Sequence, residues 1–255
     1  MINRLLVKAC AAVAAMAVSS VSFAAVISMD LFTGSWLNPT GLPSNYNTTG
    51  NGGNNPQAHW GVATGSGQSG YLLDMAPPPP VPITQNVPPN TLPFFLGDFT
   101  HVNQPIQPNS ITGIDLKIGF DIKIDATDLG NKFFDFHFDH DETPNGDNPC
   151  KYGGANNQGV NINGCADRVV ISFLNTSDTF DVGGTLYTFD LLGFSTNGGA
   201  TISSTFLTTE QLNNKAGLYA VIRAATPDQI PEPGTLALLA LGMAGLGLAR
   251  RRRVN

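Results

Sequence analysis

Ile114-Asp-Leu-Lys-Ile-Gly-Phe-Asp-Ile-Lys-Ile124 decides the fold class, because every even-numbered residue in it is apolar and every odd-numbered residue is polar or glycine. Such alternation puts one set of side chains on a core and the other in water, which is typical of a half-buried β-strand. Phe134-Asp-Phe-His-Phe138 repeats the pattern, after a turn that we predict at residues 128–131. The two segments therefore predict two strands joined by a turn.

The region around these strands holds more short apolar segments bounded by Gly, Asn and Pro. Further strands are predicted at residues 26–36, 59–64, 94–99, 168–174, 179–182, 185–190 and 218–223. Gly183-Gly184 suits a two-residue hairpin loop between two of them. Only residues 208–215 suit a helical turn, with Thr208 as its cap. Residues 38–57 should form a long loop, and the Pro-rich loop 76–93 an extended connection without ladder hydrogen bonds.

This pattern of many short strands and turns predicts one all-β domain over residues 25–229, an antiparallel β-sandwich with a jelly-roll-like arrangement. The chain has 255 residues and a formal charge of −6, and only 13% of its residues are charged. This composition excludes a coiled coil, a collagen, a charged disordered chain and a polytopic membrane protein. There is no basic surplus to neutralise phosphates, so we expect no nucleic-acid partner.

The N-terminus has the order of features found in a secretory signal peptide, predicted here as residues 1–24. Arg4 and Lys8 form a positive start, and an apolar core follows at residues 9–18. Ser22 and Ala24 are small residues at the −3 and −1 positions of a cleavage site, so we expect cleavage after Ala24. The mature protein should then fold outside the cytoplasm, where disulfides are allowed.

The C-terminus, residues 230–255, combines Pro231-Glu232-Pro233, an apolar run at residues 235–249, and an arginine cluster made of Arg250, Arg251, Arg252 and Arg253. As a helix the run spans about 22 Å, which is shorter than the ~30 Å hydrocarbon core. Arginines that extend toward the lipid headgroups can close the gap, and as a cluster they should stay cytoplasmic. The prolines keep the preceding segment extended. These features predict a weak C-terminal anchor in the inner membrane with the body exported.

The three-part tail resembles the PEP-CTERM sorting signal. The resemblance covers about the last 25 residues and implies processing by an exosortase, a membrane-embedded cysteine protease or transpeptidase. It also implies a Gram-negative host that makes exopolysaccharide, and a mature product that is secreted or held at the cell surface without its transmembrane helix.

Cys150 and Cys165 remain once Cys10 is lost with the signal peptide, and they lie in an Asn/Gly-rich loop. A disulfide between them would close a loop of about 15 residues. Metal binding and a reactive thiol are the alternatives, but neither a second cysteine pair nor a basic environment accompanies them.

Phe95-Leu-Gly-Asp-Phe-Thr-His-Val-Asn-Gln-Pro-Ile106 resembles the hallmark of a PEP-CTERM subfamily named for its Thr-His-x-Asn motif. Thr100, His101 and Asn103 match the naming positions, and the resemblance implies an exported β-sandwich with no assigned activity. In a strand, His101 and Asn103 would share one face. One interpretation is a strand end whose His and Asn satisfy loop backbone groups; the other is a catalytic histidine.

Asp135-Phe-His-Phe-Asp-His-Asp-Glu142 is the densest group of potential metal ligands. As a strand it would present Asp135, His137, Asp139 and Asp141 on one face and phenylalanines on the other. Three interpretations stay open: a solvated strand face, a Ca²⁺ loop, and another metal site. The Ca²⁺ loop would use Asp139, Asp141 and Glu142, with Asn145 and Asp147.

The sequence as a whole favours an exported, non-enzymatic cell-envelope or matrix protein without a required cofactor, contributing to exopolysaccharide-associated biofilm or floc structure. A first alternative is a carbohydrate-binding module that stacks sugars on aromatic side chains. Its candidate platform comprises Trp36, Tyr46, Trp60, Tyr71 and Tyr152. A second alternative is a secreted hydrolase that uses His101 or the Asp135–Asp141 face. Neither His101 nor Asp139 is expected to belong to the core, so alanine at either position should leave the fold intact.

Overall fold

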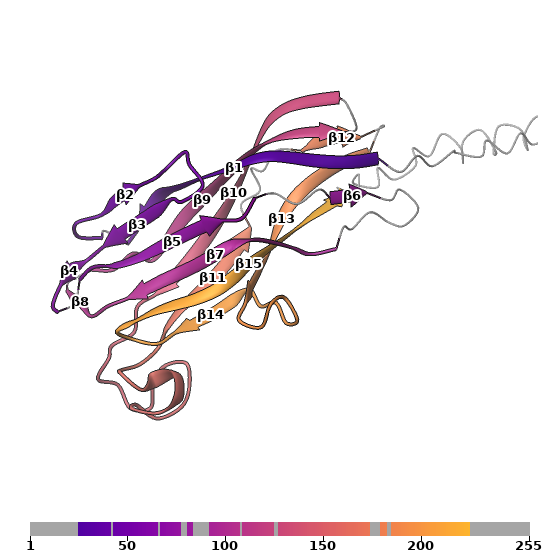
Figure 1. The fold of residues 1–255 in the computed structure, drawn as a ribbon. Helices are drawn as coiled ribbons and strands as arrows, with labels where there is room; N and C mark the ends of the chain where they lie inside the picture. Colours follow the sequence, from indigo (N-terminus) through magenta and orange to yellow (C-terminus); the bar gives the residue numbers. More distant parts are fainter. Residues whose placement is uncertain are drawn as a thin grey trace, which may run out of the picture.

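The computed structural model describes residues 25–224 except 42, 66, 78–80, 84–91, 108, 125–126, 174–178 and 183–184. These residues form curled antiparallel sheets, and the strands of Figure 1 run mostly along one long axis. A six-stranded sheet has the order β14-β11-β10-β9-β1-β6, and a seven-stranded sheet the order β12-β13-β15-β7-β5-β3-β2. A third, two-stranded sheet pairs β4 with β8.

The six-stranded sheet is centred on the alternating segment that opened the sequence. Its strands are β1 (Ala25–Thr40), β6 (Val81–Ile83), β9 (Gly113–Ile124), β10 (Thr127–Asp141), β11 (Asp167–Phe173) and β14 (Thr205–Thr208). The seven-stranded sheet contains β2 (Asn47–Thr49), β3 (Gln57–Trp60), β5 (Ser69–Met75), β7 (Phe94–Asn103), β12 (Phe180–Val182), β13 (Thr185–Ser195) and β15 (Leu212–Ala224). The short sheet is made by β4 (Val62–Ala63) and β8 (Ile106–Gln107).

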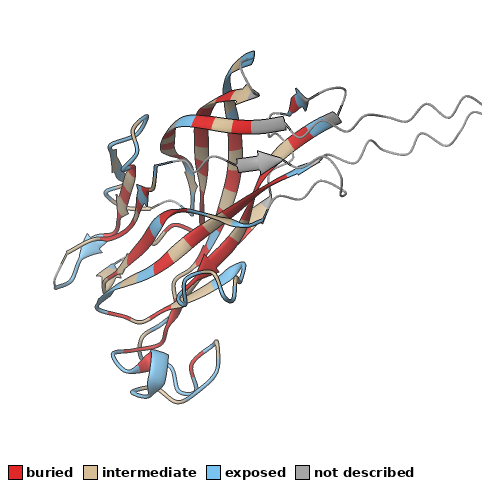
Figure 2. Ribbon diagram, turned by 45° about the vertical axis from the view of Figure 1, so that its right-hand side comes forward, coloured by how far each residue is buried: buried red, intermediate tan, exposed pale blue. Residues whose placement is uncertain are grey.

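The core lies between the two large sheets and is rich in aromatic rings. Buried and partly exposed positions alternate along the central strands, as Figure 2 shows in red and tan. Phe138 of β10 stacks on Phe99 of β7 at 5.7 Å between ring centroids, so side chains of one sheet contact those of the other. Trp36 of β1 is also buried here and donates its indole N–H to the carbonyl of Pro56 at 3.1 Å.

A long loop between β10 and β11 closes one end of the two sheets. Cys150 and Cys165 are joined in it by a disulfide, with 15 residues of sequence separation. A short 3₁₀ turn at Gly159–Asn161 lies inside the closed segment. The Thr143 hydroxyl donates to the carbonyls of Cys165 and Ala166, which ties the beginning of the loop to its end.

The structure confirms the predicted strands and corrects three local predictions. Residues 208–215 are not helical: β14 ends and β15 begins within them, with only a turn between. β10 already begins at Thr127, so residues 128–131 belong to a strand with a register shift rather than to a turn. The Pro-rich loop 76–93 contains β6, whose Val81 to Ile83 pair with β1, so part of it does join a ladder.

The segment 38–57 also holds more regular structure than a loop, because β1 continues to Thr40 and β2 lies within it. One interior strand was not predicted at all. β5 lies between β3 and β7; burial alternates from Tyr71 to Met75, but apolar Leu72 stands on the less buried face, so the sequence lacks a clear period-two signal. The pairing of β12 with β13 confirms the two predicted strands of the hairpin at residues 180–190, whereas its predicted loop, Gly183-Gly184, lies outside the described residues.

Candidate functional site

The Thr-His-x-Asn motif forms the end of β7 and points its histidine and asparagine into the protein. His101 and Asn103 are completely buried, and Thr100 is nearly so on the opposite face. The predicted alternation is therefore confirmed. Both inward side chains contact Thr208 at the end of β14: His101 Nδ1 lies 2.8 Å from the Thr208 hydroxyl oxygen, and Asn103 Nδ2 donates to the Thr208 carbonyl at 3.2 Å.

A second histidine, His140, faces His101 from the opposite sheet. It continues the inward parity of Phe134, Phe136 and Phe138 along β10, so the strand's alternation carries it inward. The two imidazole rings are perpendicular, with centroids 5.2 Å apart. His140 Nδ1 lies 2.7 Å from the Tyr71 hydroxyl, and its Nε2 lies 3.3 Å from a carboxylate oxygen of Glu142.

Three carboxylates complete this buried histidine–carboxylate cluster, which comprises His101, His140, Glu142, Asp167 and Glu210. Asp167 begins β11, is fully buried, and accepts a hydrogen bond from the Thr143 backbone N–H at 2.7 Å. Glu210 lies in the turn between β14 and β15 and is also fully buried. Donor atoms of His101, His140 and Asp167 lie within 4.8 Å of one another, as do those of Glu142, Asp167 and Glu210.

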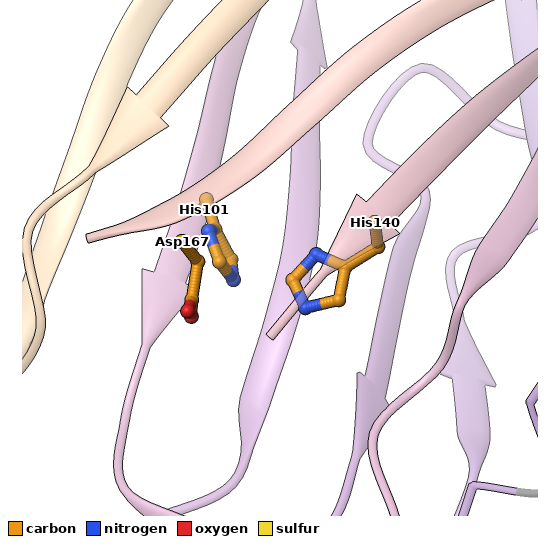
Figure 3. A group of neighbouring side chains, drawn as sticks. All are labelled: His101, His140 and Asp167. Carbon is orange, nitrogen blue, oxygen red and sulfur yellow. The ribbon is translucent and has the colours of Figure 1, made fainter. Parts of the chain in front are cut away.

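Figure 3 shows how the two histidines and Asp167 approach one another from three strands. Trp60 covers the histidines, stacking on His101 at 6.1 Å and meeting His140 edge-on at 5.4 Å between centroids. The disulfide loop adds a further contact, because Asn163 donates to the Glu210 carbonyl at 3.0 Å. Aromatic rings and this loop therefore shield the histidines, Asp167 and Glu210 from water, whereas the Glu142 side chain is 22% exposed.

Burial sets the protonation of the cluster, because a low-polarity environment disfavours charged forms. It raises the pKa of Asp167 well above its usual range, and the Glu142 charge adds to the effect. Burial and the Glu142 charge also raise the pKa of Glu210 to about 7. Burial and the neighbouring His140 hold the pKa of His101 well below its usual range. Burial thus favours the uncharged forms of Asp167, Glu210 and His101.

The raised pKa of Glu210 predicts a pH dependence of stability. The pKa of this carboxyl is about 7 in the folded state and 4.5 in the unfolded state. It therefore stabilises the fold at low pH, and that stability is lost as the pH rises from 4.5 to about 7. Asp167 acts in the same direction, whereas the lowered pKa of His101 acts in the opposite one. Relative to Glu210→Gln, the wild type should therefore lose about 1–3 kcal/mol of unfolding free energy from about pH 5 to about pH 8.

The difference in unfolding free energy is measured by urea denaturation of both proteins across this pH range. A chelator is present, so that no metal ion binds the cluster and only protonation changes with pH. A difference that stays constant with pH, or that grows in favour of the wild type as the pH rises, would contradict the assignment.

The predicted ligand face of β10 is solvent-facing and does not converge. His137 pairs with Asp115 at 2.6 Å across the strands, and Asp139 accepts from the Ser172 hydroxyl at 3.1 Å. Asp141 is bound by Lys151 and Tyr152; burial raises its pKa, but these hydrogen bonds outweigh burial and lower it. Of Asp139, Asp141 and Glu142, only Glu142 belongs to a group of close donor atoms among the described residues.

Two further expectations are corrected by burial. Trp36, Trp60 and Tyr71 have 0–1% of their surface exposed, so they belong to the core and form no sugar-stacking platform. His101 is core as well, contrary to the expectation that alanine there would be harmless. Its partner is Thr208 rather than a loop backbone group at the strand end.

His140, Asp167 and Glu210 were not predicted as site residues. His140 and Asp167 carry a weak signal, since each has the inward parity of the apolar residues on its own strand. Glu210 has none, because only the pairing of β14 and β15 with their neighbours brings that turn to the cluster.

The C-terminal tail matches a known sorting signal. Residues 229–253 match the PEP-CTERM protein-sorting motif. No curated protein matches the chain. Ala24 and the sorting residues Pro231, Glu232, Pro233 and Arg250 to Arg253 lie outside the described residues. Within the described ranges no helix is long and apolar enough to cross a membrane.

Proposed function

We propose that the chain is an exported, non-enzymatic protein of the cell envelope or extracellular matrix, sorted and processed by an exosortase through its C-terminal tail. The match of residues 229–253 to the PEP-CTERM protein-sorting motif carries the proposal, since this motif is a substrate signal for exosortase. The motif implies export and an anchored precursor in a Gram-negative bacterium. The signal peptide, the cleavage after Ala24 and the final place at the cell surface or in the medium are part of the proposal.

The physical steps follow from the tail's three parts. The apolar run at residues 235–249 holds the precursor in the inner membrane, and the arginine cluster keeps its own end in the cytoplasm. Pro231 and Pro233 keep the segment between domain and membrane extended, which suits a protease cleft. Removal of the tail then frees the domain from the bilayer.

The body of the protein has properties that suit an extracellular life. Residues 25–230 carry 7 basic and 18 acidic residues, a net charge of −11, which keeps such a domain soluble and apart from other acidic polymers. A disulfide closes its longest loop. As part of this proposal, the domain is a jelly-roll-like sandwich. It would contribute to exopolysaccharide-associated biofilm or floc structure.

The processing step is tested by intact-mass measurement of the exported protein. In a host with exosortase, the mature chain should lack residues 1–24 and the arginine cluster, whereas a strain without exosortase should accumulate a membrane-bound form that keeps the tail. Changing Pro231 and Pro233 to alanine should have the same effect as loss of the enzyme. Pro227→Ala, just outside the matched residues, is the control and should be processed normally. A mature mass that retains the arginines in the presence of exosortase would contradict the proposal.

A further inference from the structure

The buried histidine–carboxylate cluster contains polar atoms that no described residue satisfies. They are Nε2 of His101, Oδ2 of Asp167 and both carboxylate oxygens of Glu210. His101 and Asp167 have no exposed surface, and leaving such groups unpaired inside a protein costs free energy. His101 and Asp167 belong to one group of close donor atoms, so one partner placed there could satisfy both of them.

The two imidazoles are oriented as in many metal sites. In such sites one ring nitrogen binds the ion and the other is held by a second hydrogen-bonding group. Nδ1 of His101 contacts Thr208, and Nδ1 of His140 contacts Tyr71, so both Nε2 atoms are left for the cluster. Asp167 also has one atom held by a hydrogen bond and one that is left over. Its Oδ1 accepts from the Thr143 N–H, and its Oδ2 has no partner among the described residues.

We propose that His101, His140 and Asp167 bind one divalent transition-metal ion of the zinc type, with Glu142 and Glu210 as the adjacent carboxylates. The donor atoms of His101, His140 and Asp167 lie within 4.8 Å of one another. Bonds of about 2.0–2.2 Å in a tetrahedral zinc site place two ligand atoms about 3.3–3.6 Å apart. From the outer limit of 4.8 Å, two ligand atoms would have to approach each other by about 1.2–1.5 Å, a movement shared between their two side chains.

The chemistry of the donors selects the class of ion. Two imidazole nitrogens suit zinc and its neighbours in the transition series, whereas calcium and magnesium prefer oxygen ligands only. Burial alone disfavours the ionised form of a carboxyl. The positive charge of a divalent ion would stabilise that form in Asp167. The site therefore differs in both residues and metal class from a Ca²⁺ loop built on Asp139 and Asp141.

The location assigns the ion a structural role. His101 belongs to the seven-stranded sheet and His140 and Asp167 to the six-stranded one, so a shared ion would link the two sheets. Thr143 connects Asp167 to the disulfide loop. The closed class of zinc sites has four protein ligands, and Glu142, whose carboxylate oxygen lies 3.3 Å from His140 Nε2, would supply the fourth here.

The metal content of the exported full chain tests the proposal. The protein would be produced with zinc in the medium, purified from a Gram-negative host in mild detergent, and analysed by inductively coupled plasma mass spectrometry. We expect about one zinc per chain, and uptake of Co²⁺ after chelation with the visible absorption of nitrogen and oxygen coordination. His140→Gln and Asp167→Asn should each weaken binding by at least about 100-fold.

A matched control lies on the same strand but on its outer face. His137→Gln combined with Asp139→Asn removes a histidine and a carboxylate there, and it should leave stoichiometry and affinity unchanged. Wild-type protein that holds no zinc and takes up no Co²⁺ would overturn the proposal even if the cluster variants failed to fold. Binding that survives in both cluster variants, or that is lost in the outer-face control, would overturn it as well.

Discussion

Replacing Phe138 by alanine should lower the free energy of unfolding by about 3–5 kcal/mol, the range for a large aromatic side chain removed from a packed core. Phe138 is fully buried and its ring lies against Trp36 and Phe99, at 5.2 and 5.7 Å between centroids. Trp36 belongs to its own sheet and Phe99 to the other, so the cavity would open at the interface between the sheets. Domains of this size have only about 5–15 kcal/mol of stability, so the loss should be evident in urea denaturation.

Phe133 supplies the control on the same strand. It is 42% exposed and faces outward, near the Lys117 ammonium at 5.6 Å. Its replacement by alanine should therefore cost less than about 1 kcal/mol, as most surface changes do. Equal losses for the two variants would mean that Phe138 does not occupy the core between the sheets.

Changing Cys150 and Cys165 together to serine should cost about 3 kcal/mol, because the disulfide closes a loop of 15 residues and so restricts the unfolded chain. The folded state should suffer too, since the Thr143 hydroxyl donates to the Cys165 carbonyl and the Thr143 N–H binds Asp167. Thermal unfolding of the exported protein with and without a reductant measures the effect.

Reductant also serves as the control when the wild type is compared with the double cysteine variant. It should destabilise the wild type to about the level of the double variant and leave the double variant unchanged. A wild type that is insensitive to reductant, with two titratable thiols after denaturation, would show that the cysteines are not joined.

The sequence predicted the strands well where one face is buried and the other is wet. β9 and β10 are examples, since their alternation follows directly from the pleat of a strand. β5 was missed because neither of its faces is regularly polar. The short helix predicted at residues 208–215 failed because pairing with β7 and β11 outweighs a weak local preference.

The cluster was only partly predictable. His101 and Asn103 were identified from their motif, and their shared face from strand geometry. Their surroundings depend on contacts over long sequence separations, such as the 107 residues between His101 and Thr208. No local sequence pattern predicts that the turn containing Glu210 contacts the end of β10. The partnership of the two histidines therefore required the three-dimensional structure.

The direction of β15 determines how the domain would be presented to its surroundings. The strand starts at Leu212, opposite Asn103 and close to the buried cluster, and ends at Ala224 at the opposite end, beyond which the sorting tail follows. Thirteen residues of strand at about 3.3 Å each separate these ends by about 40 Å. While the tail is anchored as proposed, the end of the domain that carries the disulfide loop would lie away from the lipid surface, where it would meet the polymers outside.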